Sequence, residues 1–421
     1  MKVRSLLLSM CAIVALASCS KNDDGIPGGG SDAPEAKVIL KLVGNSDQVT
    51  SKAAGIPGDL DTKNGTVNDL TVFIFNQSGI VITKQYIGTP ATGANSISTT
   101  TDAKKVAVVA NTGDMTGTGG AFASVASEDA LKAVLSDMLV DPDNIDGAVT
   151  HKDANLYMSG IDDLSPFSDD GGVQKATATV QLHYLSARIQ LTEITFNGGG
   201  VTDNVYAQAN DFATNTDANF TITRVYLMNA QRVTHFLPAT DGNSDYITQD
   251  LKQYTGGVAW ATPWTGTPPN QFKPNNEYTV EAGTTNFTPG SGQTANKISD
   301  IGHWYTFANT GVSDINNHPT ALVVEVLWRK TKANQGEGVA EELQTMYFTT
   351  YFGGGDKEEL VAGKAYTVKL ALNGNFKPTN EGGSGGGGTE DPTKPTVNSS
   401  VEVTVNAATW VLATEISKEW K

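Results

Sequence analysis

The chain has 421 residues, of which 45 are acidic and 29 are basic, so its formal net charge is −16. The acidic groups are dispersed, and this charge balance argues against nucleic acid as a partner, because phosphates require a basic face. Only two cysteines are present, Cys11 and Cys19. If the first lies in a leader and the second is lipidated, the mature chain has no disulfide, and its stability must come from a core and strand pairing.

Residues 1–18 predict a secretory signal peptide. Lys2 and Arg4 precede an apolar run that is too short to span a membrane, and small residues follow it. Cys19, after Leu-Ala-Ser, resembles the acylated cysteine of the bacterial lipobox, and residues 20–24 (SKNDD) resemble the surface-export tag of lipoproteins in the Bacteroides group. Lipid on Cys19 would hold the precursor on a membrane. The alternative is plain secretion with an incidental cysteine.

The next feature is a strand followed by an open loop. Val38, Leu40 and Leu42 alternate with other residues, as in a half-buried strand. Lys52 and Ala53 then stand among small residues, and a run rich in Gly, Pro and Asp extends to residue 65, which is typical of a loop that proteases reach. We therefore expect residues 19–52 to be a lipidated propeptide with a removable first strand. An ordinary strand and loop is the alternative.

The body of the chain predicts an all-β sandwich fold. Short alternating or β-branched runs recur, at residues 70–75, 106–110, 176–182, 187–194, 220–228, 321–328, 346–352 and 364–372. One helix is expected over residues 127–138, capped by Ser127. A Gly/Asp break at residues 170–174 predicts a boundary between an N-terminal domain, 53–172, and a C-terminal domain, 173–375.

The C-terminal end combines a loose tether with two more strand patterns. Residues 376–398 form a Gly-rich linker, and residues 399–421 follow it. Apolar residues alternate in both strand patterns of this extension, which are, in order, Val401, Val403 and Val405, and then Trp410, Leu412 and Ile416.

Taken in order, several motifs resemble those of the fimbrillins, the major pilus subunits of Bacteroides and Porphyromonas. Beside the lipobox, the early strand and the basic cleavage-like site, they are NDLTVFIF (68–75), VAVVAN (106–111), LYMSG (156–160), ARI (187–189), VYLMN (225–229) and WYTFAN (304–309). The resemblance implies two transthyretin-like β-sandwich domains in tandem, export as a lipoprotein to the outer membrane and cell surface, and removal of the first strand by an arginine- or lysine-specific protease. It also implies polymerisation by strand exchange with other copies and other pilins.

This chain departs from the family in the residue offered to the protease. Well characterised members are cut after Arg, whereas here the candidates are Lys52 and, less well placed, Lys63. Loss of Val38, Leu40 and Leu42 would leave an apolar groove, and the C-terminal extension has the period of two that is needed to fill it. We expect residues 410–420 to insert and Val401 to Val405 to bridge the subunits, although the reverse assignment stays open. The expected product is a head-to-tail fibre in which this chain is a shaft subunit.

Signals for catalysis or cofactors are weak. The pattern Gly382-x-Ser384-x-Gly386 arises from a glycine run and lacks the strand and helix of a nucleophile elbow. The five histidines show no i, i+4 pair, which argues against a zinc site. We therefore expect no enzyme activity, no cofactor and no metal. The alternative function is a glycan-binding surface lipoprotein that does not polymerise and uses Trp260 and Trp264.

Overall fold

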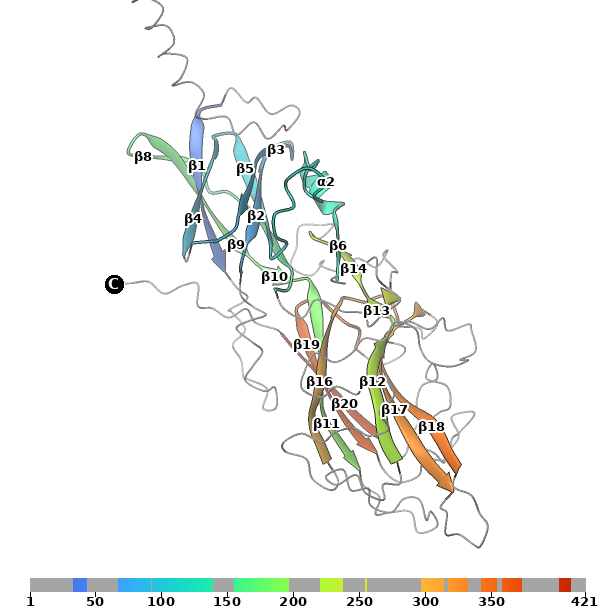
Figure 1. The fold of residues 1–421 in the computed structure, drawn as a ribbon. Coiled ribbons are helices and arrows are strands. Elements are labelled where there is room, and N and C mark those ends of the chain that lie inside the picture. The colour runs from blue at the N-terminus through green and yellow to red at the C-terminus, as the bar shows by residue number, and fades with distance from the viewer. Residues whose placement is uncertain are drawn as a thin grey trace, which may run out of the picture.

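The computed structural model describes residues 33–43, 67–91, 93–138, 155–196, 220–237, 254–255, 297–313, 317–331, 342–353, 358–372 and 401–409. Strands dominate these residues, and Figure 1 shows them in two groups stacked end to end. The all-β prediction is confirmed. No helix in the described ranges is long and apolar enough to cross a membrane.

The first group consists of two sheets that share one hydrophobic core. The β1 sheet has the order β4 (Ala94–Thr100), β1 (Glu35–Val43), β9 (Val173–Gln181) and β8 (Ser168–Asp170). The β5 sheet has the order β10 (His183–Tyr184), β7 (Met158–Asp163), β5 (Ala103–Ala110), β2 (Leu70–Asn76) and β3 (Val81–Ile87).

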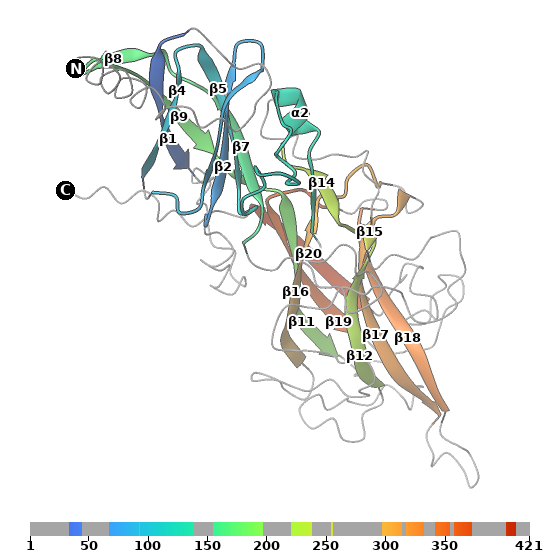
Figure 2. The same cartoon turned by 45° about the horizontal axis from the view of Figure 1, so that its top comes forward.

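The central strands of the β5 sheet are buried on both faces, which explains why their sequences are apolar runs rather than alternations. Leu70 to Phe75 in β2 and Val106 to Ala110 in β5 are all fully buried. The β1 sheet lies on one side of them, and the segment around helix α2 (Glu128–Lys132) lies on the other (Figures 1 and 2). Phe122 and Leu131 from this segment complete the first core.

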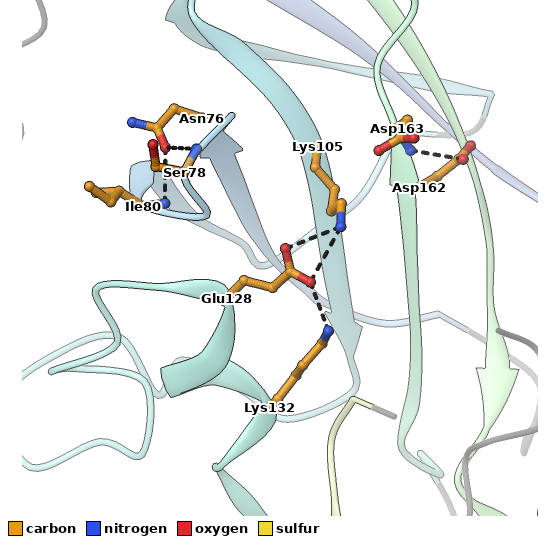
Figure 3. A network of polar contacts seen from close by, with 8 residues as sticks. All are labelled: Asn76, Ser78, Ile80, Lys105, Glu128, Lys132, Asp162 and Asp163. Carbon is orange, nitrogen blue, oxygen red and sulfur yellow. Dashed lines mark hydrogen bonds and ion pairs between the residues drawn. The ribbon is translucent and has the colours of Figure 1, made fainter. Parts of the chain in front are cut away.

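Helix α2 is held on the β5 sheet by charge. The Ser127 Oγ atom caps it by accepting a hydrogen bond from the Ala130 N–H at 3.1 Å. Glu128 forms ion pairs with Lys105 of β5 at 3.2 Å and with Lys132, one turn along the helix, at 2.8 Å (Figure 3). The predicted start of the helix is confirmed, but the predicted end at residue 138 is wrong. Leu135–Asp137 form strand β6, because they pair with β14 (Val233–His235) of the second half of the chain.

The turn between β2 and β3 is closed by a side chain, as Figure 3 also shows. The Asn76 Oδ1 atom accepts hydrogen bonds from the N–H groups of Ser78 and Ile80, both at 3.0 Å. Gly79 has φ +73°, a conformation that glycine adopts without strain. The hairpin therefore fixes β3 at the edge of the β5 sheet.

The second group also has two larger sheets around a core of its own. The β11 sheet has the order β16 (Lys297–Phe307), β11 (Ser186–Phe196), β19 (Lys364–Leu372) and β20 (Val401–Thr409). The β17 sheet has the order β12 (Phe220–Met228), β17 (Thr320–Thr331) and β18 (Glu342–Phe352), and a small pair joins β13 (Ala230–Gln231) to β15 (Tyr254–Thr255).

The predicted domain boundary at residues 170–174 lies two strands too early, because β9 and β10 both pair within the first group. Strand β9, which the prediction assigned to residues 173–375, pairs with β1 in the first group. Gly171 and Gly172, with φ of +68° and +84°, form the turn of the β8–β9 hairpin, so the Gly/Asp break marks a hairpin turn and not a domain boundary. The chain passes to the second group between β10, which pairs with β7, and β11, which begins at Ser186.

Candidate strand-exchange site

Strand β1 is the second strand of its sheet and has a neighbour on each side. It pairs antiparallel with β4, with Val38 opposite Ile97, and parallel with β9, with Leu40 opposite Ala178. Removal of a strand at the edge of a sheet breaks one ladder of hydrogen bonds, whereas removal of β1 breaks two. The sheet would be split into β4 on one side and the β9–β8 hairpin on the other.

The side chains of β1 alternate between the core and solvent. Val38 and Leu40 are completely buried and Leu42 is 9% exposed, while Lys37 and Lys41 are exposed. Burial of aliphatic side chains contributes about 1.5 to 3 kcal/mol each. The predicted displaced strand is thus placed where its three apolar residues support the first core.

The strands beside β1 set different residues opposite Val38 and Leu40. On β9, Ala176 and Ala178 are 2% exposed and stand opposite Val38 and Leu40. On β4, the buried Ile97 stands opposite Val38. The sequence predicted a strand at residues 176–182 but did not indicate that this strand pairs with β1. The small alanines mean that a strand in this position must itself bring bulky apolar side chains.

The C-terminal strand β20 is placed away from β1, at the edge of the β11 sheet. It pairs antiparallel with β19, and its register sets Val403 opposite Leu370 and Val405 opposite Val368, two residues of the second core. The third valine, Val401, stands opposite Leu372. Within the described residues β20 has a partner on one side only, which makes it simpler to detach than β1.

The direction of β20 determines where the end of the chain leaves the molecule. Thr409 pairs with Lys364, whose neighbour Gly363 donates a hydrogen bond from its N–H to the Ser186 carbonyl at 2.9 Å, at the junction between the groups. Val401 lies at the opposite end of the second group. The Thr409 end of β20 therefore lies beside the first group, and its Val401 end lies away from it.

Several predicted site residues lie outside the described residues. They are Cys19, Lys52, Ala53, Trp410, Leu412 and Ile416, together with Trp260 and Trp264 of the alternative glycan site. In the part of the chain that the structure describes, no group of three or more His, Cys, Asp or Glu side chains is arranged to hold a metal ion.

Two family models match the chain. The model described as "Major fimbrial subunit protein (FimA)" matches residues 36–161, and the model described as "FimA-like major fimbrial subunit protein, C-terminal domain" matches residues 264–410. Together they cover more than half of the chain. The first match begins inside β1 and the second ends just after β20, so both strands of interest belong to the matched segments. Comparison with curated protein sequences gives no match.

Solved structures agree with the family models. A Bacteroides eggerthii protein assigned to cell adhesion is 28% identical, with a TM-score of 0.60 over 91% of this chain and 98% of that one. A Parabacteroides distasonis protein, also assigned to cell adhesion, is 14% identical, with a TM-score of 0.53 over 92% and 99% of the two chains. The fimbrilin of Porphyromonas gingivalis W83 is 15% identical, with a TM-score of 0.52 over 90% and 99%. At these identities the last two show the fold alone.

The resemblance in the sequence motifs is therefore confirmed by independent comparisons of sequence and of fold. These comparisons point to a structural component of a cell-surface fimbria, which accounts for the absence of a catalytic signal in the sequence. The chain belongs to the family of FimA-like major fimbrial subunits, the fimbrillins.

Proposed function

We propose that this fimbrial subunit is a shaft component that polymerises by donor-strand exchange, with the position of β1 as the acceptor groove. The observation that carries the proposal is the burial of Val38 and Leu40 in a strand with a partner on each side. Such a strand leaves a long apolar slot with two unpaired edges when it is removed. An empty slot of this kind accepts a substitute strand, because both the hydrogen bonds and the buried area are recovered.

The proposed maturation has two steps. The precursor is lipidated on Cys19 and held at the outer membrane. A Lys/Arg-specific protease then cuts after Lys52, or after Lys63, between β1 and β2, and a chain beginning at Ala53 is left. Both candidate bonds follow β1 and precede β2, so either cut separates β1 from the rest of the first group.

The direction of β1 supports entry of the donor from the outer end of the first group. β1 runs from Glu35 at that end to Val43 beside Gln181, close to the junction. A donor in the same direction is antiparallel to β4 and parallel to β9, and it comes from a molecule stacked beyond Glu35. A tail that leaves its own β20 at the junction would have to enter its own groove in the opposite direction. The direction of β1 therefore favours insertion of a neighbouring subunit's C-terminal segment over insertion of the chain's own.

Donation in this direction is most direct if β20 detaches from its own sheet. While β20 is paired, the residues that follow Thr409 begin at the junction. If β20 is released, the whole segment that can reach another subunit begins after Leu372, at the opposite end of the second group. The proposed donor contains Val401, Val403 and Val405, followed by Trp410, Leu412 and Ile416, and a head-to-tail contact of this kind builds an open fibre.

The first test removes residues 399–421 from the full chain. We expect the truncated chain to be exported and cut but to give no high-mass polymers when cell-surface material is separated by mass. The Trp260→Ala variant is the matched control, because it changes a residue of the alternative glycan site and keeps residues 399–421. This variant should still form polymers. Polymers that persist without residues 399–421 would overturn the proposal.

A second test identifies the strand that is inserted. The mature chain has no cysteine, so an engineered pair supplies the only thiols. Ser98, which is exposed on β4 opposite Lys37, is changed to Cys and combined with a cysteine scan of residues 402–406 or of residues 411–415. Disulfide-linked dimers in the first scan would assign the valine strand to the groove, and dimers in the second would assign the Trp410 strand.

A further inference from the structure

A short segment of the second half of the chain is built into the first group of strands. We call residues 232–237 the clasp. Its strand β14 pairs with β6, with Thr234 opposite Ser136, and the Ser136 Oγ atom donates to the Thr234 carbonyl at 3.0 Å. At one end of the clasp, the Arg232 carbonyl accepts a hydrogen bond from the Met138 N–H at 2.7 Å, and the Arg232 guanidinium pairs with Asp137 at 3.1 Å.

The other end of the clasp enters the first hydrophobic core. The Phe236 side chain is 1% exposed and lies between the rings of Phe122 and Tyr157, with centroid distances of 5.3 and 5.4 Å. Its N–H donates to the Val134 carbonyl at 3.2 Å, and its carbonyl accepts from the Ser159 hydroxyl. Phe236 is thus a member of the first core although it is contributed by the second half of the chain.

The clasp and β1 support the β5 sheet from opposite sides. Figure 1 shows β14 and β6, and Figure 2 shows β14, on the side of the β5 sheet that faces away from β1. The contact between Phe236 and Phe122 continues to Phe73 of β2, since the rings of Phe73 and Phe122 are 5.4 Å apart. None of the rings in this contact chain comes from β1.

We infer that the clasp is a built-in support that keeps the acceptor half of the subunit folded while its groove is empty. The inference rests on the proposed function, because only a chain that loses β1 needs such a support. Strand removal takes Val38, Leu40 and Leu42 out of the core on one side. The clasp anchors the β5 sheet to the second group on the other side. Loss of β1 therefore unfolds only the β1 sheet, and the β5 sheet stays folded.

Hydrogen exchange on the full, uncut chain tests this inference without any need for polymers. In the wild-type chain at low denaturant, amides of β1, β4 and β9 are expected to exchange at least tenfold faster than those of β2 and β5, because the β1 sheet opens by itself. In Phe236→Ala, exchange in β2 and β5 should rise to the rate of the β1 sheet. The matched control is Phe348→Ala, which removes a ring that is 2% exposed in the second core and should leave the tenfold difference unchanged.

A milder variant keeps the test decisive if Phe236→Ala does not fold. Asp137→Ala removes the ion-pair partner of the partly exposed Arg232. It should speed exchange in β2 and β5 and so reduce the difference in exchange rate between the β1 sheet and these strands by about threefold. The inference is overturned if either variant changes exchange only in β6 and β14, or if the β1 and β5 sheets of the wild-type chain exchange together. Failure of the C-terminal truncation to stop polymers would instead refute the proposed function and leave this result untouched.

Discussion

Leu40 is the residue at which the removable-strand model differs most sharply from an ordinary first strand. Its side chain is completely buried, while the adjacent Lys41 is exposed. Leu40→Ala should lower the free energy of unfolding of the precursor by about 2 to 5 kcal/mol, whereas Lys41→Ala should change it by less than about 0.5 kcal/mol. Denaturant titration of the two uncut precursors measures both values.

The same substitution should have no effect on the finished fibre. A mature chain that begins after Lys52 lacks residue 40, so fibres from Leu40→Ala and wild-type cells should dissociate at the same temperature. Fibres that are weakened as much as the precursor would show that β1 stays in the assembled subunit.

His303 of β16 predicts a pH dependence in the second group. Burial, with a further contribution from the nearby Arg188 guanidinium, lowers the pKa of His303 from 6.5 to about 4. The unfolded chain therefore binds a proton between pH 6.5 and pH 4 that the folded chain does not bind, and stability falls as the pH drops through this window. His303→Gln should flatten the dependence of the melting temperature on pH between 6.5 and 4. An unchanged slope would assign the acid sensitivity to other groups.

The proposed donor strand β20 and the proposed displaced strand β1 are predicted to differ in how much stability the chain loses when each is removed. β20 is at a sheet edge and β1 is not. Removal of residues 399–421 should lower the melting temperature of the uncut precursor by only a few degrees. Cutting the precursor between residues 44 and 66 and washing out β1 should lower it by far more, because two ladders and three buried side chains are lost. Calorimetry on both forms measures the difference, and equal losses would contradict the assigned roles.

Local patterns predicted ten of the twenty strands in the described residues, but not their partners. All eight strand runs in the body of the chain are confirmed within a few residues, because alternation and β-branching are properties of the segment itself. The helix was predicted to run too far, since residues 135–137 pair with β14, almost 100 positions away. The Gly/Asp break at residues 170–174 was predicted to be a domain boundary, because glycine is common both at such boundaries and in hairpin turns. The position of β1 between β4 and β9 could not be read from its alternation, which is the same for edge and inner strands.

For the whole molecule, the two cores and the clasp describe a subunit whose halves are tied together. Tyr305 and Phe307 of β16 also belong to the first core, so the second group supports the first at more than one place. The proposed donor and acceptor strands lie in different groups, so opposite ends of the molecule would be available to two neighbours. This arrangement is what a head-to-tail fibre requires.

If the assembled subunit has lost β1, the N-terminal sequence and mass of the chain in surface fibres will show it. We expect a chain that begins at Ala53, or at Asn64 if Lys63 is the site of cleavage, recovered in species that resist mild dissociation. A lipidated chain that begins at Cys19 and is always monomeric would contradict it.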